Sequence, residues 1–138
     1  MTRLQEQICD IYDGLQTKLG NEDACHFLCL CSIAHEFTGK PVDVLGTITK
    51  VHGKWMETGY YVTDALAILK MLTGHKWTIR KVPMLPPVIK DNEYTELLWE
   101  NPKTGRQHFT RRYVDTVKNS KTVKDGYVKE YRIYTVEV

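Results

Sequence analysis

The segment Asn21–Gly39 constrains the fold more than any other part of this chain, because its apolar face is too wide for a surface helix. The apolar residues that recur at helical spacing are Phe27, Leu28, Leu30, Cys31, Ile33, Ala34 and Phe37. Polar and acidic residues at its start, and Gly39 followed by Pro41 at its end, are typical helix boundaries. We therefore expect a largely buried helix around which the other elements pack.

Cys25 lies in the first turn of this predicted helix. Free backbone N–H groups and the positive end of the helix dipole favour a thiolate there, which is a recurring arrangement for a thiol nucleophile. Cysteine is also among the most buried residue types, and most buried cysteines are inert. The position of Cys25 alone leaves both interpretations open.

Length and composition are those of an ordinary globular domain. The chain has 138 residues, of which 42% are hydrophobic and 26% charged, enough for a single domain over residues 1–138 with its own core. The net charge of +2 is too small to indicate a nucleic-acid partner. No apolar stretch has the length of a membrane span, and the N-terminal residues lack the apolar core of a signal peptide. All four cysteines lie in the first quarter of the chain, three of them on one predicted helix, which favours reduced thiols and a cytoplasmic protein.

Residues 1–74 read as a helical half. The expected elements are a helix over Thr2–Leu19 ended by Gly20, the helix described above, a short helix over Val44–Val51 that stops near Gly53, a loop over Trp55–Tyr61, and a helix that Thr63 or Asp64 caps and Gly74 ends. Apolar residues on one side of each helix indicate that the helices pack together or on another layer.

Residues 75–138 read as a β half. The expected elements are a strand over Lys76–Val82, a break at Pro83, Pro86 and Pro87, a hairpin of Tyr94–Glu100 and Arg106–Val114 around the turn Asn101–Gly105, a short pairing segment over Lys121–Lys124, and a long strand over Tyr127–Val138. Helices followed by strands predict an α+β fold, with the N-terminal helices packed on a C-terminal antiparallel sheet. A cleft between the two halves is then a natural place for a site.

A cysteine nucleophile needs a base, which is usually a histidine. The histidines of this chain are His26, His35, His52, His75 and His108. His26 follows Cys25 directly and points to another side of the helix, and His35 lies roughly three turns further along it. His108 begins a predicted strand just after a turn, where a sheet can present its ring across a cleft to the helix N-terminus. It is therefore our candidate base.

A cysteine at the start of an early buried helix, followed by a histidine–aromatic pair on a later strand, resembles the papain-like cysteine peptidase superfamily. The resemblance is greatest to its small, minimal branch, which includes the double-glycine leader peptidases and related phage and bacterial families of unknown function. The segments that carry it are Ala24–Leu28, Gln107–Phe109, Asn119–Gly126 and Tyr131–Tyr134.

The resemblance implies a papain-like fold and a cysteine peptidase or amidohydrolase that needs no cofactor and binds no metal. Cys25 would attack the carbonyl carbon of a peptide, protein or small-molecule amide, or of a thioester, and His108 would protonate the leaving group. In such families an aspartate follows the histidine strand and orients the ring, and Asp115 matches that role. On a regular strand Asp115 and His108 would point to opposite faces, so the role requires a bulge or an early strand end. Asn119 is the reserve candidate.

The same resemblance implies a site that stabilises the oxyanion. The backbone N–H of Cys25 would donate one hydrogen bond and a side-chain amide the other. Papain-like enzymes usually place a glutamine a few residues before the cysteine, but the chain has Leu19 at that position. Gln16 and Asn21 are the available substitutes.

Two other functions compete with this one. The first is a zinc site on the central helix, which is rich in residues that can bind zinc: Cys25, His26, Cys29, Cys31 and His35. These residues form no paired Cys-x-x-Cys turn.

The second competitor is a papain-like fold without catalysis that binds a ligand or a protein, for example as a phage-encoded inhibitor. Its ligand would be an anion or a nucleotide held by basic residues and by the stacking surfaces of Trp55, Tyr60 and Tyr61. Those basic residues are Lys103, Arg106, Arg111, Arg112, Lys118, Lys121 and Lys124. We expect no membrane partner and no nucleic-acid partner in either case.

Overall fold

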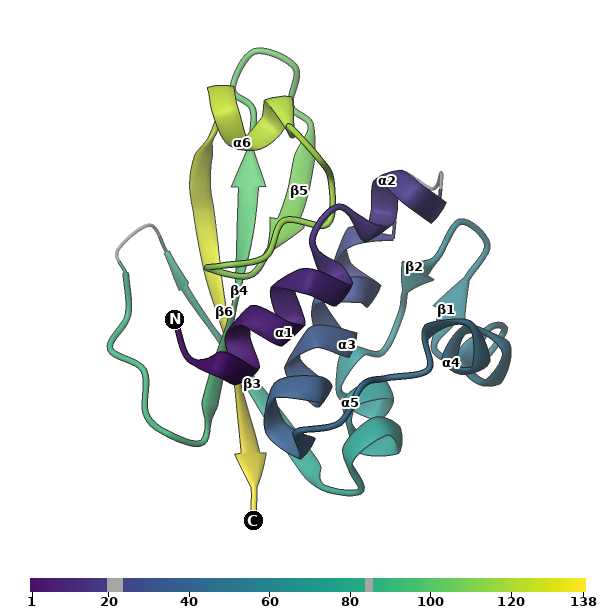
Figure 1. Cartoon of the computed structure of the whole chain (residues 1–138). Coiled ribbons are helices and arrows are strands. Elements are labelled where there is room, and N and C mark those ends of the chain that lie inside the picture. The colour runs from purple at the N-terminus through teal and green to yellow at the C-terminus, as the bar shows by residue number, and fades with distance from the viewer. Residues whose placement is uncertain (20–23, 84–85) are drawn as a thin grey trace.

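The computed structural model describes residues 1–19, 24–83 and 86–138. The helices are α1 (Arg3–Tyr12), α2 (Leu15–Leu19), α3 (Cys25–Thr38), α4 (Val44–Val51), α5 (Ala65–Thr73) and α6 (Lys121–Asp125). The strands are β1 (Met56–Glu57), β2 (Tyr61–Val62), β3 (Lys76–Pro83), β4 (Glu93–Glu100), β5 (Gln107–Thr110) and β6 (Tyr127–Glu137). The protein is therefore an α+β protein, and this part of the sequence-based prediction is confirmed. Figure 1 shows α1 to α5 beside the sheet and α6 at one end of it.

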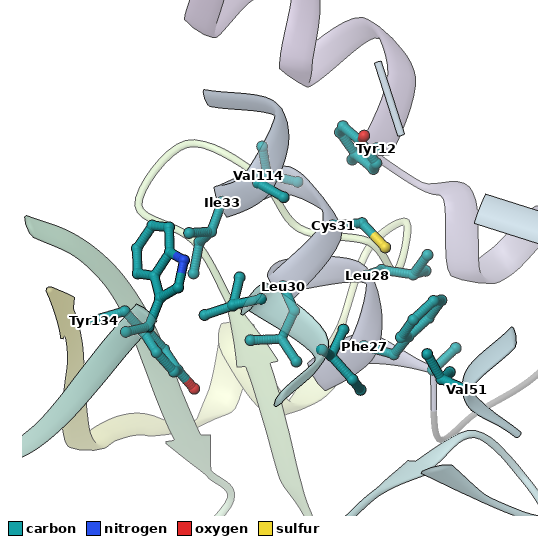
Figure 2. Close-up of a cluster of buried hydrophobic side chains, with 14 of the residues drawn as sticks. Tyr12, Phe27, Leu28, Leu30, Cys31, Ile33, Val51, Val114 and Tyr134 are labelled. Carbon is teal, nitrogen blue, oxygen red and sulfur yellow. The ribbon is translucent and has the colours of Figure 1, made fainter. Parts of the chain in front are cut away.

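Helix α3 is the centre of the core, as the width of its apolar face predicts. Its side chains from Phe27 to Ile33 are completely buried, and Gly39 ends it in the left-handed conformation with φ 74°. Figure 2 shows the side chains of this helix that it labels directed to several sides, with Phe27 next to Val51. Burying one large apolar side chain contributes about 1.5–3 kcal/mol, so α3 fixes the positions of the elements around it.

The main sheet is antiparallel and has the strand order β3-β6-β4-β5. β3, β4 and β6 begin or end within one residue of the predicted bounds. One buried hydrophobic cluster combines residues from both halves of the chain, for example Phe27 and Leu30 with Trp77, Tyr134 and Val136. In the described part of the chain, no helix is both long enough and apolar enough to cross a membrane.

The predicted helix Thr2–Leu19 is wrong in one respect, because it is two helices. α1 ends at Tyr12, Gly14 takes a left-handed conformation with φ 69°, and α2 starts at Leu15. The N–H of Gly14 donates to the carbonyl of Asp115 instead of continuing the helix. A tertiary hydrogen bond thus interrupts a sequence with good helical periodicity.

Three further predictions are corrected by the structure. The segment Trp55–Tyr61 is not a plain loop, because it contains β1 and most of the β1–β2 hairpin. Lys121–Lys124 is helical rather than extended, since the Ser120 hydroxyl accepts from the N–H of Val123 and caps α6. β5 ends at Thr110 rather than at residue 114.

Other predicted helix boundaries agree with the structure. Asp64 caps α5 by accepting from the N–H of Ala67, and Gly74 ends this helix with φ 74°. α4 covers the predicted residues. The predicted start of the central helix at residues 21–23, and the stop at Gly20, lie outside the described residues.

Candidate functional site

Cys25 is the first residue of α3, in the turn whose backbone N–H groups have no acceptor within the helix. The residue before it, Ala24, has no side chain that could cap these groups. Cys25 is 8% exposed, so its thiol is close to the surface but mostly covered. Cys25 therefore lies at the end of α3 where backbone N–H groups are free of helical acceptors.

His108 contacts both of its predicted partners. It lies on β5, opposite Trp99 of β4, and its Nε2 is 2.7 Å from Oδ1 of Asp115. Cys25 is also close to the ring, because its hydrogen bonding and its charge both raise the pKa of His108. The structure thus brings Cys25 and Asp115 together around the ring of His108.

The surroundings of His108 determine its charge. Burial disfavours the imidazolium form, but the hydrogen bonds to Asp115 and Cys25 and the negative charges of these residues outweigh burial and raise the pKa of His108 to about 9. At neutral pH the ring is therefore protonated, which is the form that can donate a proton to a leaving group.

Asp115 reaches His108 because β5 ends early. After Thr110 the chain leaves the sheet, and the N–H of Arg111 donates to the carbonyl of Val114. This turn removes the constraint of strand alternation, which would have put the two side chains on opposite faces. The carboxylate of Asp115 also accepts from the N–H of Val117, at 2.9 Å from Oδ1, and this bond fixes its orientation.

A set of long-range hydrogen bonds, which we call the N-terminal joint, connects residues 13–17 to residues 115–118. The N–H of Gly14 donates to the carbonyl of Asp115 at 2.9 Å, and the N–H of Gln16 donates to the carbonyl of Thr116 at 2.8 Å. In the other direction, the N–H of Asp115 donates to the carboxylate of Asp13 at 3.1 Å. The joint therefore holds Asp115 against the start of α2.

The joint also places Gln16. Its side chain is 3% exposed, and its Oε1 accepts from the hydroxyl of Thr116 at 3.0 Å, so the amide is held in one orientation. Gln16 and His108 line the same groove. Asn21 lies outside the described residues, and Asn119 also lines the groove, but the residue that bonds to His108 is Asp115.

The groove beside His108, which we call the His108 groove, has a volume of about 820 Å³. The β4–β5 turn and the segment from residue 117 to α6 form its walls. Cys25 is absent from the described residues that line this groove, and it is mostly buried.

A second polar network, which sequence reasoning missed, supports this arrangement. His26 Nδ1 is 2.7 Å from Oε2 of Glu96, a fully buried carboxylate that also accepts from the hydroxyl of Tyr134 at 2.8 Å. The ring of His26 stacks on Phe109, with 4.5 Å between the ring centres. His26, the residue after Cys25, thus contacts Phe109, the residue after His108. The sequence signal was Glu96 itself, an acidic residue directly before the apolar residues Leu97, Leu98 and Trp99 of β4.

Arg111 does not belong to an exposed basic face, contrary to the binding hypothesis. Its guanidinium is buried, with Nε donating to the carbonyl of Thr95 at 2.6 Å and Nη2 to Glu36 at 2.7 Å. Tyr113 donates to the same carboxylate of Glu36 at 2.8 Å. Arg111 thus connects α3 to β4 inside the protein.

The aromatic residues proposed as a stacking surface lie elsewhere. Trp55 and Tyr60 pack partly against the core, and Tyr61 is 65% exposed on β2. None of the three is among the described residues that line the His108 groove.

The remaining cysteines differ from Cys25. Cys29 and Cys31 are completely buried, and burial is the main reason why the pKa of each thiol lies above its ordinary value. Cys9 donates to the carbonyl of Tyr113 at 3.0 Å. In the described part of the chain, no three His, Cys, Asp or Glu side chains are arranged to hold a metal ion.

Comparisons of this chain with protein-family models, with curated proteins and with solved structures find no match.

Proposed function

We propose that this protein is a papain-like cysteine hydrolase, a peptidase or an amidohydrolase, in which Cys25 is the nucleophile. The observation that supports this most directly is the position of His108 between Cys25 and Asp115. A thiol, an imidazole and a carboxylate in this order are the groups that acyl transfer through a cysteine requires.

Each residue has one role in the proposed reaction. The Cys25 thiolate attacks the carbonyl carbon of an amide or a thioester, and the Cys25 N–H and the Gln16 amide stabilise the oxyanion. The His108 imidazolium gives its proton to the leaving group as the C–N or C–S bond breaks. Neutral His108 then takes a proton from water, which attacks the thioester and releases the acid and the Cys25 thiolate. Asp115 holds the ring throughout.

The first test is the reactivity of Cys25. We expect iodoacetamide at neutral pH to label Cys25 before the other three cysteines, as mapped by peptide mass spectrometry. His108→Ala should slow this labelling by roughly tenfold or more, because the thiolate loses its positive partner. Cys9→Ser is the control, since Cys9 is the other cysteine that is not fully buried. It should leave the labelling rate of Cys25 unchanged.

The second test is turnover. A mixture of synthetic peptides incubated with the protein and analysed by mass spectrometry should yield cleavage products that disappear in Cys25→Ser and His108→Ala. Asp115→Asn should reduce the rate by roughly tenfold or more, since the ring loses its orienting carboxylate. Products that persist in Cys25→Ser would contradict the proposed nucleophile.

A second candidate function is a catalytically inactive protein that binds an anionic ligand. The observation that favours it is that the described lining of the His108 groove contains cations but not Cys25. A Cys25 that resists alkylation in a folded protein would favour this alternative over the hydrolase.

A further inference from the structure

The His108 groove is strongly biased towards positive charge. Lys103 and Arg106 line it from the β4–β5 turn and Lys121 from the first turn of α6, while Asp125 is the acidic residue in the described lining. In the described part of the chain, none of the three cations forms an ion pair. All three are exposed, so their charges are available to a ligand.

The three cations line two walls of the same groove. Figure 1 shows α6 beside the end of β4 and the start of β5. The β4–β5 turn between these two strands carries Lys103 and Arg106. Gly126 allows this approach, because a Cβ at that position would lie 2.6 Å from the carbonyl oxygen of Glu100. The groove between these two walls leads inward to His108 and Gln16.

The position of His108 indicates which part of a substrate enters the groove. In the proposed function, His108 donates a proton to the leaving nitrogen, so the substrate beyond that nitrogen lies on the His108 side. This is the side on which the groove opens. A positively charged ligand would be repelled by the basic groove, whereas the carboxylates of an acidic ligand would complement it.

We propose that the His108 groove binds acidic residues on the leaving-group side of a peptide substrate, that is, C-terminal to the bond that is cleaved. The inference rests on the proposed function, and it adds the substrate class and the direction in which the substrate lies. A carboxylate at the peptide's own C-terminus has the same chemistry, and the experiment below separates it from acidic side chains.

The experiment uses peptides that carry their reactive group at one defined end. An N-chloroacetyl peptide alkylates Cys25 with its residues on the leaving-group side, and a C-terminal chloromethyl ketone places them on the opposite side. The probes are N-chloroacetyl tetraglutamate amide, the tetraglutamine amide, the tetraglutamine with a free carboxylate, and the tetraglutamate and tetraglutamine chloromethyl ketones. The rate of Cys25 modification is measured by intact-protein mass spectrometry.

We expect the N-chloroacetyl tetraglutamate to react about tenfold faster than the tetraglutamine amide at low salt, and the difference to shrink at high salt. The two chloromethyl ketones should differ much less. In Lys103→Glu/Arg106→Glu/Lys121→Glu the preference should disappear or reverse. The control Lys50→Glu/Lys70→Glu/Lys76→Glu changes the net charge equally at exposed lysines outside the groove, and it should keep the preference.

Several results would overturn this inference. Equal rates for the acidic and neutral N-chloroacetyl peptides exclude an acidic ligand, and a preference that survives the groove variant excludes these cations. A preference for the free carboxylate alone assigns the groove to a peptide C-terminus instead of acidic side chains.

Failure of the proposed function would look different. If no probe modifies Cys25, the hydrolase is wrong, and the groove is then tested by fluorescence anisotropy with fluorescein-labelled tetraglutamate amide. Binding that the groove variant loses and the control keeps supports an acidic ligand, and absence of binding overturns it.

Discussion

The charge of His108 is set by two opposing influences on its ring, and the proposed site depends on that charge. Burial favours the neutral ring, whereas the hydrogen bonds and charges of Asp115 and Cys25 favour the imidazolium and raise the pKa of His108 to about 9. Because the folded state binds this proton more tightly than the unfolded state, the associated stability is fully present below about pH 6.5 and is lost as the pH rises through about 9.

We predict that the His108 ring titrates near pH 9 in proton–carbon NMR spectra, assigned with His108→Gln. Asp115→Asn should move the midpoint down, because the ring loses the charge of its hydrogen-bond partner. Asp125→Asn removes a carboxylate that lines the His108 groove but does not bond to His108, and it should leave the midpoint nearly unchanged. A midpoint that stays near 9 without the Asp115 charge would contradict the role of this residue.

At the scale of the elements, the break between α1 and α2 is the feature that joins the helical half to the candidate site. Gly14 has φ 69°, and a Cβ added there would meet its nearest neighbour, Lys118 Cβ, at 4.0 Å. The position therefore has room for a side chain, and the requirement for glycine is conformational. The N–H of Gly14 donates to the carbonyl of the residue that orients His108.

We predict that Gly14→Ala lowers the free energy of unfolding by about 1 kcal/mol and also slows alkylation of Cys25. Gly14→Asn should cost less, since asparagine tolerates the left-handed conformation better. Gly53→Ala is the matched control, because Gly53 has φ 81° and open space around it but lies outside the joint. It should lower stability in urea unfolding without slowing alkylation. Equal alkylation rates in the two alanine variants would mean that the joint does not position the site.

The elements that local pattern determines could be predicted from the sequence, and those that distant contacts determine could not. Periodicity and caps predicted α3, α5, β3, β4 and β6, because each of these elements follows mainly from the pattern of its own residues. The early end of β5 and the break at Gly14 depend on hydrogen bonds between segments far apart in the sequence. The pairing of Cys25 with His108 could be proposed, but the network of His26 and Glu96 and the burial of Arg111 required the tertiary structure.

At the scale of the whole molecule, a buried histidine makes the fold sensitive to acid. His35 is 2% exposed, and in the described part of the chain its Nδ1 has no hydrogen-bond partner. Burial lowers the pKa of His35 from its ordinary value of 6.5. The unfolded chain therefore binds a proton at His35 more tightly than the folded chain does. The free energy of unfolding then decreases as the pH drops below about 6.5.

We predict that the free energy of unfolding of the wild type decreases between about pH 6.5 and pH 5, and that His35→Leu reduces this decrease. Leucine fills a similar apolar site and does not titrate. Urea unfolding at several pH values measures the difference between the two proteins. Parallel curves for the wild type and His35→Leu would show that other groups cause the acid sensitivity.

The strand order β3-β6-β4-β5 determines how this molecule can fold during synthesis. β6 is made last of the four strands, yet it lies between β3 and β4, and Trp77 pairs with Val136 at the far end of the chain. Until β6 emerges, β3 has no partner in the described sheet and β4 exposes a free edge, which is the kind of surface that aggregates. Closing such distant pairs is slow compared with forming helices. The helices α1 to α5 can therefore form during synthesis while the sheet still lacks its central strand, and the unpaired β3 and β4 need protection from aggregation during that interval.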